Sequence, residues 1–186
     1  MKSILLTLVQ TKRGLEFLDN EFEDDLRRKS AVIFGCYAAV LFFFDFEERT
    51  GAYAFVITFF ELTLHVFLSI LVGMFCAYIL FKIGQWLGGK ANYTEIFSLL
   101  AYAFVPIILG LILVIALKNI ESFHHDYNNT HTRNFVLYLS WFFSLKILIF
   151  GLTKFNNYSI KKAIITIAPF IIVQTLLLVL ELYIIN

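Results

Sequence analysis

Glu61 and His65 lie four residues apart inside a long apolar run, which places both on one face of a helix. A carboxylate and an imidazole at this spacing can share a hydrogen bond or relay a proton, so they form the candidate polar pathway of the chain. Ionisable groups inside a membrane are functional suspects because lipid does not solvate them. The alternative is that Glu61 lies at the outer membrane boundary and anchors the helix there, and the length of the run favours this alternative.

A second candidate site is the polar segment ESFHHDYNNTHTR, which begins at Glu121. It contains four side chains of the types that bind divalent metals, namely His124, His125, Asp126 and His131. Their spacing matches no closed metal site, and an exposed polar loop explains the same residues. These four are weak candidates, and we expect neither a metal nor a cofactor.

The chain carries no motif of a nucleophilic enzyme, a zinc protease, a phosphate-binding loop or a dinucleotide fold. Its apolar runs also contain too few polar groups to converge on an active site. A net charge of +1 leaves no uncompensated basic cluster for nucleic acid. Both cysteines, Cys36 and Cys76, lie within apolar runs and indicate no disulfide framework. We therefore expect a non-catalytic protein that binds no nucleic acid.

The elements that would position these residues are transmembrane helices. The 186 residues are 60% hydrophobic and 16% charged, and the mean hydropathy is +0.79, well above the values of soluble domains. Apolar runs long enough to cross a ~30 Å hydrocarbon core recur along the chain. We predict an all-α, polytopic bundle with spans over 30–46, 62–81, 96–117, 135–152 and 163–185. Residues 30–186 form this membrane domain.

The distribution of basic residues orients the predicted spans. Eleven Lys and Arg residues fall on the side of the N-terminus and three on the other side. Loops rich in Lys and Arg stay in the cytoplasm, so we predict a cytoplasmic N-terminus and an external C-terminus. An odd number of spans is required for the two ends to lie on opposite sides.

Residues 1–29 precede the first span and are predicted to form an amphipathic cytoplasmic helix. Acidic residues separate apolar residues that recur at helical spacing: Ile4, Leu8, Leu15, Leu18, Phe22 and Leu26. Such a helix can lie on the inner membrane surface or pack against the bundle. Both alternatives fit the pattern.

Small residues at four-residue spacing allow helices to approach closely in lipid. The first span carries Ala31, Gly35 and Ala39, and the second carries Ser69, Gly73 and Ala77. Because consecutive spans run antiparallel, we expect these two stripes to face each other, with Gly35 near Gly73.

The stretch WLGGKANYTEIFSLLAYAFVP joins the second span to the third. Its glycine pair, Gly88 and Gly89, permits a tight turn, and Asn92 or Thr94 can cap the following helix. Pro106 lies inside the third span, where it frees a backbone carbonyl and can kink the helix. We favour a structural kink over a functional hinge.

At these residues the chain resembles the Yip-domain membrane proteins. The family pattern is a glycine pair that closes the second span, then a polar turn and an apolar run ending in proline. A second block, SWFFSLKILIFGLTKFNNYSIKKAIITIAP, is similar too, and so is the N-terminal LVQTKRGLEFLDN. The residues that carry the resemblance are Gly88, Gly89, Tyr102, Pro106, Gly151, Ser159, Lys162, Ala163 and Pro169.

The resemblance implies five membrane helices with a cytoplasmic N-terminus. Eukaryotic members of this family lie in Golgi and endoplasmic reticulum membranes, form complexes with one another and with prenylated Rab proteins, and act in vesicle traffic. This chain has neither their long N-terminal region nor an aspartate-leucine-tyrosine-glycine-proline motif before the first span, so we do not carry Rab-type GTPase binding over. It looks more like the compact prokaryotic members, which implies the cytoplasmic membrane of a bacterium.

We predict a membrane scaffold or adaptor that acts through contacts with lipids and other membrane proteins, or through self-association. The alternative is a small membrane transporter or channel, in which Pro106, Glu61 and His65 shape a path.

Overall fold

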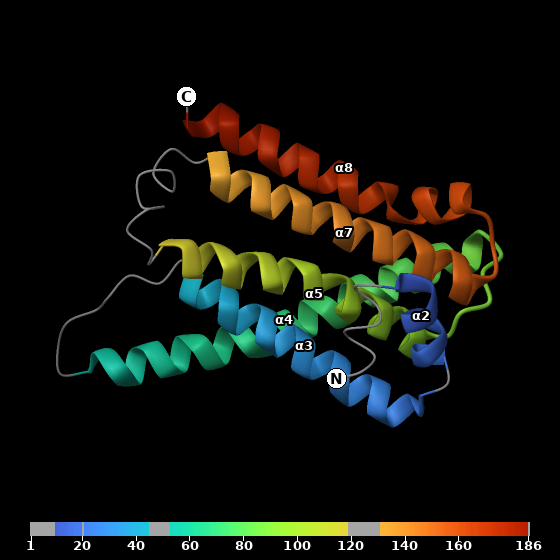
Figure 1. Cartoon of the computed structure of the whole chain (residues 1–186), viewed down its shortest axis with the longest axis horizontal. Coiled ribbons are helices and arrows are strands. Elements are labelled where there is room, and N and C mark those ends of the chain that lie inside the picture. Colours follow the sequence, from blue (N-terminus) through green and yellow to red (C-terminus); the bar gives the residue numbers. More distant parts are fainter. Residues whose placement is uncertain (1–9, 20, 45–52, 119–130, 186) are drawn as a thin grey trace.

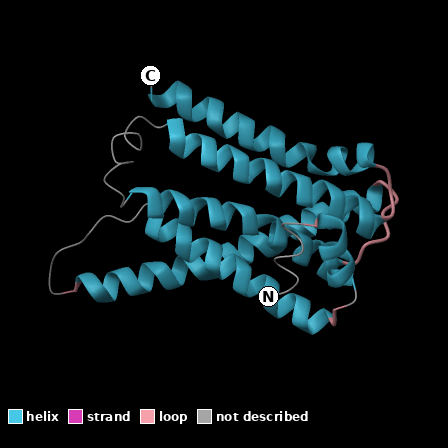
Figure 2. Cartoon of the chain, in the orientation of Figure 1, coloured by secondary structure: helices cyan, strands magenta, loops and turns pink. Residues whose placement is uncertain are grey.

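The computed structural model describes residues 10–19, 21–44, 53–118 and 131–185. Six helices account for nearly all of these residues, and the described part of the chain contains no strand (Figure 2). Their order is α2 (Thr11–Asp19), α3 (Glu23–Phe44), α4 (Ala54–Trp86), α5 (Tyr93–Lys118), α7 (His131–Asn156) and α8 (Ile160–Ile185). The prediction of an all-α fold is confirmed.

Five long helices lie alongside one another, and the short helix α2 packs near one end of them (Figure 1). Helix α5 is the centre of the bundle because it packs against α3, α4 and α7. The apolar stretch of α5 is 56% buried, whereas that of α4 is only 17% buried. Helix α4 therefore presents most of its circumference to the surroundings, and α8 packs on the outside of α7.

Large apolar side chains cover the outside of the bundle. Phe55, Phe60 and Phe142 each expose more than 60% of their surface. In water this surface would be costly, but hydrocarbon is as apolar as the side chains and accepts them without penalty. The outer surface is therefore the kind that faces lipid.

Three of the described helices are long and apolar enough to cross a membrane: α4, α5 over Tyr93–Leu117, and α7 over Asn134–Asn156. Four of the five predicted spans fall within one helix each, and the first, 30–46, ends two residues beyond α3, outside the described residues. The helices α3 and α8 are not among the three candidates. The apolar part of α3, from Ser30 to Phe44, is shorter than the ~20 residues that a straight span needs. Several side chains of α8 lie outside the described residues.

The predicted amphipathic segment is divided into two helices instead of one. Leu15 and Leu18 of α2 are buried, and so is Leu26 of α3, but Phe22 between the two helices is 84% exposed. Helix α3 begins anew at Glu23, where three consecutive acidic residues suit the positive end of its dipole. Ile4 and Leu8 lie outside the described residues.

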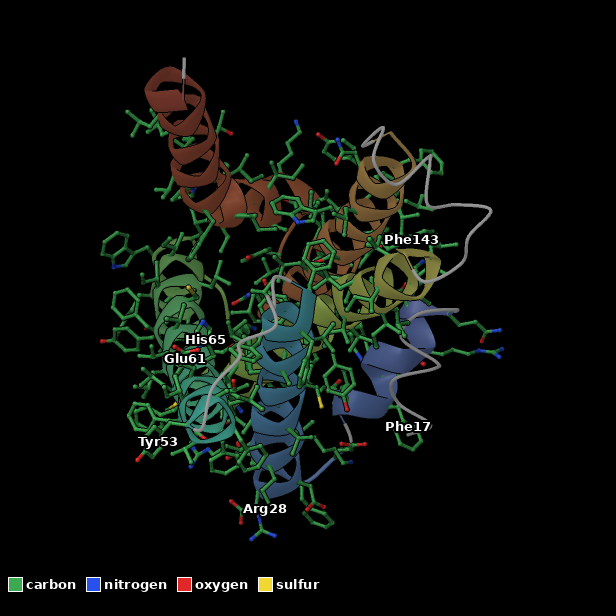
Figure 3. All side chains as sticks on the ribbon, turned by 90° about the vertical axis from the view of Figure 1, so that its left-hand side faces the viewer. Phe17, Arg28, Tyr53, Glu61, His65 and Phe143 are labelled. Carbon is green, nitrogen blue, oxygen red and sulfur yellow. The ribbon has the colours of Figure 1, made fainter. Side chains whose placement is uncertain are left out.

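Of the two alternatives for this segment, the structure places α2 against the bundle. Helix α2 packs on α7, and Lys154 pairs with Asp19 at 3.4 Å. Phe17 projects away from the bundle on the opposite face of α2 (Figure 3) and is 45% exposed. The inward face is therefore fixed by leucines, while an aromatic side chain faces outward.

Two proline residues lie inside helices without ending them. Helix α5 continues through Pro106, which is buried among the other helices. Helix α8 contains Pro169 and changes direction along its length (Figure 3). A proline removes one hydrogen bond from the helix ladder, and in a bundle the neighbouring helices compensate for the loss.

Candidate functional site

Two short loops lie at the same end of the bundle (Figure 2): one joins α4 to α5, and the other joins α7 to α8. They contact each other directly. Lys162 Nζ donates a hydrogen bond to the carbonyl oxygen of Leu87 at 2.6 Å. The backbone amide of Lys90 donates to the carbonyl oxygen of Asn156 at 3.2 Å. We call these two loops, residues 84–92 and 154–162, the hairpin junction.

The first loop ends α4 with a Schellman motif. The amide of Gly89 donates to the carbonyl of Gly84 at 2.8 Å, and the amide of Gly88 donates to that of Gln85 at 2.9 Å. Gly88 adopts a φ of +83°, which glycine reaches without steric cost. The glycine pair predicted to make a tight turn therefore does so by capping the helix.

The second loop ends α7 with the same motif. The amide of Tyr158 donates to the carbonyl of Thr153, and the amide of Asn157 donates to that of Lys154. Asn157 adopts the left-handed conformation with a φ of 52°, and asparagine is the residue found there most often after glycine. The two loops thus use one capping geometry, although only the first contains glycine at the left-handed position.

Asn156 fills the space between the two loops. Its side chain is 97% buried, and its amide lies against the backbones of Gly84 and Gly89. A Cβ at position 89 would collide with Asn156 Oδ1 and would lie 2.8 Å from the carbonyl oxygen of Gly84. Gly89 is therefore required for close approach, whereas Gly88 is required for its backbone conformation.

The start of α8 is fixed by polar contacts within the same region. The Tyr158 hydroxyl and Thr166 Oγ1 are 2.8 Å apart, and Thr166 in turn donates to the carbonyl of Lys162. Burial raises the pKa of the Tyr158 phenol above its ordinary value, while the hydrogen bond with Thr166 opposes this rise. The amide of Ala163 donates to the carbonyl of Ser159, which opens the first turn of α8.

Helix α5 begins with a reciprocal capping box. The amide of Glu95 donates to Asn92 Oδ1 at 2.8 Å, and the amide of Asn92 donates to Glu95 Oε2 at the same distance. Asn92 Nδ2 also donates to Glu23 Oε1, which links the starts of α5 and α3. Of the two caps expected from the sequence, Asn92 fills the role, and Thr94 is buried within the first turn of α5.

A cavity of about 540 Å³ lies inside the bundle and is lined by all five long helices. Most of its walls are apolar, and its polar lining residues are few: Tyr37, His65, Ser69, Trp141 and Ser144. Its lining atoms lack packing partners on the cavity side, so an occupant would restore dispersion contacts to them.

The residues of the candidate polar pathway, Glu61 and His65, both lie on α4 (Figure 3), and His65 lines this cavity whereas Glu61 does not. His65 Nδ1 is 2.9 Å from the backbone carbonyl oxygen of Glu61. A carbonyl oxygen only accepts, so Nδ1 carries a proton in this hydrogen bond. The His65 ring also packs edge-on against Phe42. The bond joins the imidazole to the backbone and not to the Glu61 carboxylate.

The residues that carry the family resemblance divide into two groups. Gly88, Gly89, Ser159 and Lys162 belong to the hairpin junction. The buried Tyr102 and Pro106 lie on α5, and Gly151 of α7 faces Leu99 of α5 so closely that any Cβ would collide with it. Ala163 is fully buried at the start of α8, whereas Pro169 is exposed.

A comparison with protein families matches the Yip1 domain over residues 27–181, which is most of the chain. The chain belongs to the Yip1 domain family. The match begins near the start of α3 and ends near the end of α8, so it includes the hairpin junction, the cavity and all five long helices. No curated protein and no solved structure matches this Yip1-domain chain.

The small-residue stripes of this Yip1-domain protein lie at the contact between α3 and α4, but in a different register from the expected one. The Ser69 hydroxyl donates a hydrogen bond to the carbonyl of Phe34, whereas the expected register placed Ser69 beside Ala39. Gly35 lies beside Val66, while the Phe34 ring covers Gly73. The helices are displaced by about one and a half to two turns from the expected register, and the large Phe34 ring takes the space that Gly73 leaves. Ala77 is fully buried, and Ala31 is half-buried.

The weak metal candidates fall largely outside the structural description. His124, His125 and Asp126 are not among the described residues, and His131 begins α7 with an undescribed side chain. Among the residues that are described, no group of three metal-binding side chains comes together.

Sequence reasoning missed several residues of the site. Asn156 is one, and its signal would have been a polar residue within a turn next to a span. Gly110 is another, because any Cβ there would collide with Ser140 of α7. The buried hydroxyl pair of Ser30 and Ser98, 3.1 Å apart, joins α3 to α5. Close contacts between α5 and its neighbours depend on such small residues.

Proposed function

We propose that this Yip1-domain protein is a non-catalytic membrane scaffold or adaptor with five transmembrane helices, a cytoplasmic N-terminus and an external C-terminus. The hairpin junction and α2 would then lie together on the cytoplasmic side. The eleven basic residues assigned to that side support this orientation. Its partners would be membrane lipids and other membrane proteins, or a second copy of the chain.

The observation that carries this proposal is the hydrogen bond between Lys162 and Leu87, which joins two loops that are 75 residues apart in the sequence. Short loops locked to each other present a surface of fixed shape, and a preformed surface binds partners at a lower entropic cost. Exposed side chains surround this end, among them Trp86 at 85% exposure. Tryptophan is enriched both at membrane interfaces and in protein contacts.

Site-specific photocrosslinking in native membranes tests the proposal. A photoreactive amino acid at Trp86 or Lys161 should yield discrete protein adducts, because both side chains are exposed at the hairpin junction. The same amino acid at the exposed Phe142, on the outer face of α7, serves as a control and should yield lipid adducts. Adducts to lipid alone at all three positions would contradict an adaptor role.

The orientation needs a separate measurement. Tags at the two ends of the chain should be accessible from opposite sides of sealed membrane vesicles. Tags accessible from the same side would exclude five spans.

A second candidate function is a small transporter or channel in which Glu61, His65 and Pro106 shape a path. The observation that favours it is that His65, one of these three residues, lines the cavity. A transporter should show solute- or proton-dependent flux in liposomes that Glu61→Gln abolishes. A scaffold should show no flux with either the wild-type protein or the variant.

A further inference from the structure

The cavity inside the bundle is large, elongated and apolar. Its volume of about 540 Å³ lies within the range of ligand sites between helices. Along α4 its lining runs from His65 to Leu80, a rise of about 22 Å at 1.5 Å per residue. This length is a large part of the ~30 Å hydrocarbon core. The cavity therefore runs with the helices and has the proportions of a chain, not those of a compact solute.

The chemistry of the lining excludes a charged occupant. None of the described residues that line the cavity is Asp, Glu, Lys or Arg. Two of its polar side chains already form hydrogen bonds with backbone carbonyls: His65 with the carbonyl of Glu61, and Ser69 with the carbonyl of Phe34. A charge in this space would have neither water nor a counter-charge, and its desolvation would not be repaid. The mostly apolar walls therefore suit an uncharged, largely apolar occupant.

The cavity lining reaches the outer surface of the bundle between α4 and α8. Leu68 and Val72 of α4 line it and are exposed, and so is Ile171 of α8. Leu100 and Leu148 line its inner part and are each 92% buried. Figure 3 shows α4 and α8 diverging on this side of the bundle. Hydrocarbon chains are the medium next to such a surface, so they are the molecules that meet this opening.

We infer that the cavity holds the hydrocarbon tail of a membrane lipid, which enters sideways between α4 and α8. An empty cavity would deprive its lining atoms of dispersion contacts, and a tail restores them. The inference goes beyond the scaffold proposal and does not depend on it, because it rests on the cavity and not on the hairpin junction.

Photocrosslinking with a lipid tests this inference. The wild-type protein is placed in phosphatidylcholine–phosphatidylglycerol liposomes that contain a phosphatidylcholine with a diazirine along one acyl chain. We expect adducts at the buried Leu100 and Leu148 as well as at exposed positions such as Phe142. Adducts confined to exposed positions would overturn the inference, since bulk lipid reaches only those.

A matched pair of variants on α5 separates the cavity from the outer surface. Ala103 lines the cavity and is 99% buried, whereas Ala116 is exposed on the same helix. Ala103→Phe fills the cavity and should lower the adducts at Leu100 and Leu148 at least tenfold, while those at Phe142 persist. Ala116→Phe should leave both sets unchanged. Undiminished adducts at the buried positions in a folded Ala103→Phe protein would contradict a tail in this cavity.

A measurement on the unaltered protein keeps the test decisive if Ala103→Phe does not fold. Cys76 lines the cavity as a free thiol. The label is read at the Cys76 peptide alone by mass spectrometry, because Cys36 is a second free thiol and is exposed. With a lipid tail beside it, Cys76 should resist a water-soluble thiol reagent in liposomes and react fully once the protein is denatured. Rapid labelling in the intact protein would mean a water-filled cavity, which would overturn the inference and favour the transporter alternative. The crosslinks from the hairpin junction would be unaffected by either result.

Discussion

Lys162, at the start of α8, donates a hydrogen bond from its ammonium group to the carbonyl oxygen of Leu87, the C-cap residue of α4. A lysine near the C-terminal end of a helix is favourable because the unpaired carbonyls there carry partial negative charge. Here the lysine comes from a different helix, so the bond joins α4 to α8. These two helices share few other contacts, so the bond adds to a sparse interface between them.

Lys162→Met should therefore loosen the hairpin junction. We expect a loss of about 1 kcal/mol in the free energy of unfolding, since the bond is charge-assisted but lies at an exposed position. Denaturant titration in detergent measures this difference. Lys161→Met is the matched control, because Lys161 is exposed and makes no hydrogen bond within the described residues. Equal losses for the two variants would show that the bond to Leu87 contributes nothing.

Gly89→Ala should destabilise the protein by more than 2 kcal/mol, because the added Cβ would collide with the Asn156 amide and press on the Gly84 carbonyl. Adding Asn156→Ala should recover part of the loss, as expected for two residues in contact. Gly35→Ala is the control: its Cβ would lie at an ordinary 3.5 Å from Val66, so a helix-interior alanine should be neutral or stabilising. Thermal melting in detergent compares the three. A neutral Gly89→Ala would contradict the close approach of the two loops.

Gly73→Leu should weaken the packing of α3 on α4. A Cβ at this position would lie 2.7 Å from the Phe34 ring, which is itself packed against Phe97 and Phe104. The ring has little room to move, and we expect a loss of about 2 kcal/mol. Met74→Leu, a similar volume at an exposed neighbour, should change the melting temperature little. An unchanged melting temperature for Gly73→Leu would contradict this packing.

Asn92→Ala should cost about 1 kcal/mol because it removes the cap of α5. Asn92→Ser keeps an oxygen that can accept from the Glu95 amide but loses the bond to Glu23, so it should retain most of the stability. Urea titration distinguishes the two variants. A serine variant as unstable as the alanine variant would assign the effect to Glu23 and not to the cap.

The raised pKa of Tyr158 predicts sensitivity to alkaline conditions. The unfolded phenol ionises near 10.0, but the folded one does so only at higher pH, so the folded state binds more protons between these values. Stability should therefore fall as the pH rises above about 10. Tyr158→Phe loses the bond with Thr166 and should be less stable than wild type at pH 8, but the difference should shrink above pH 10. A difference in unfolding free energy that stays constant with pH would contradict the raised pKa.

Local sequence signals predicted the features that depend on neighbouring residues. The glycine pair ends α4 and Asn92 caps α5, because each geometry is closed by hydrogen bonds within a few residues of the chain. The amphipathic N-terminal pattern gave the right buried residues, Leu15 and Leu18, but wrongly predicted one helix where two are present. The spacing of apolar residues indicates which face of a helix is buried, but it does not indicate where one helix ends and the backbone turns.

The register of α3 against α4 was decided by tertiary packing. Small residues on α3 and α4 predicted that the two helices would pack together, and they do, but the register differs from the expected one by about one and a half to two turns, with the Phe34 ring over Gly73. Several registers bring small residues together, and only the volumes of the surrounding side chains select one of them. The role of Asn156 was invisible for a similar reason, because its partners, Gly84 and Gly89, belong to a distant loop.

The sequence by itself determined that this is an all-helical protein with an apolar surface of the kind that faces lipid. The reason is that composition and the length of the apolar runs decide whether each segment is more stable in hydrocarbon or in water. Its family membership could also be read from the glycine, proline and lysine positions along the chain. Only the tertiary structure decided that two loops lock together through Lys162 and that five helices enclose a cavity beside His65. Both features arise where distant segments meet, and the shape of that space depends on the three-dimensional packing of all the helices at once.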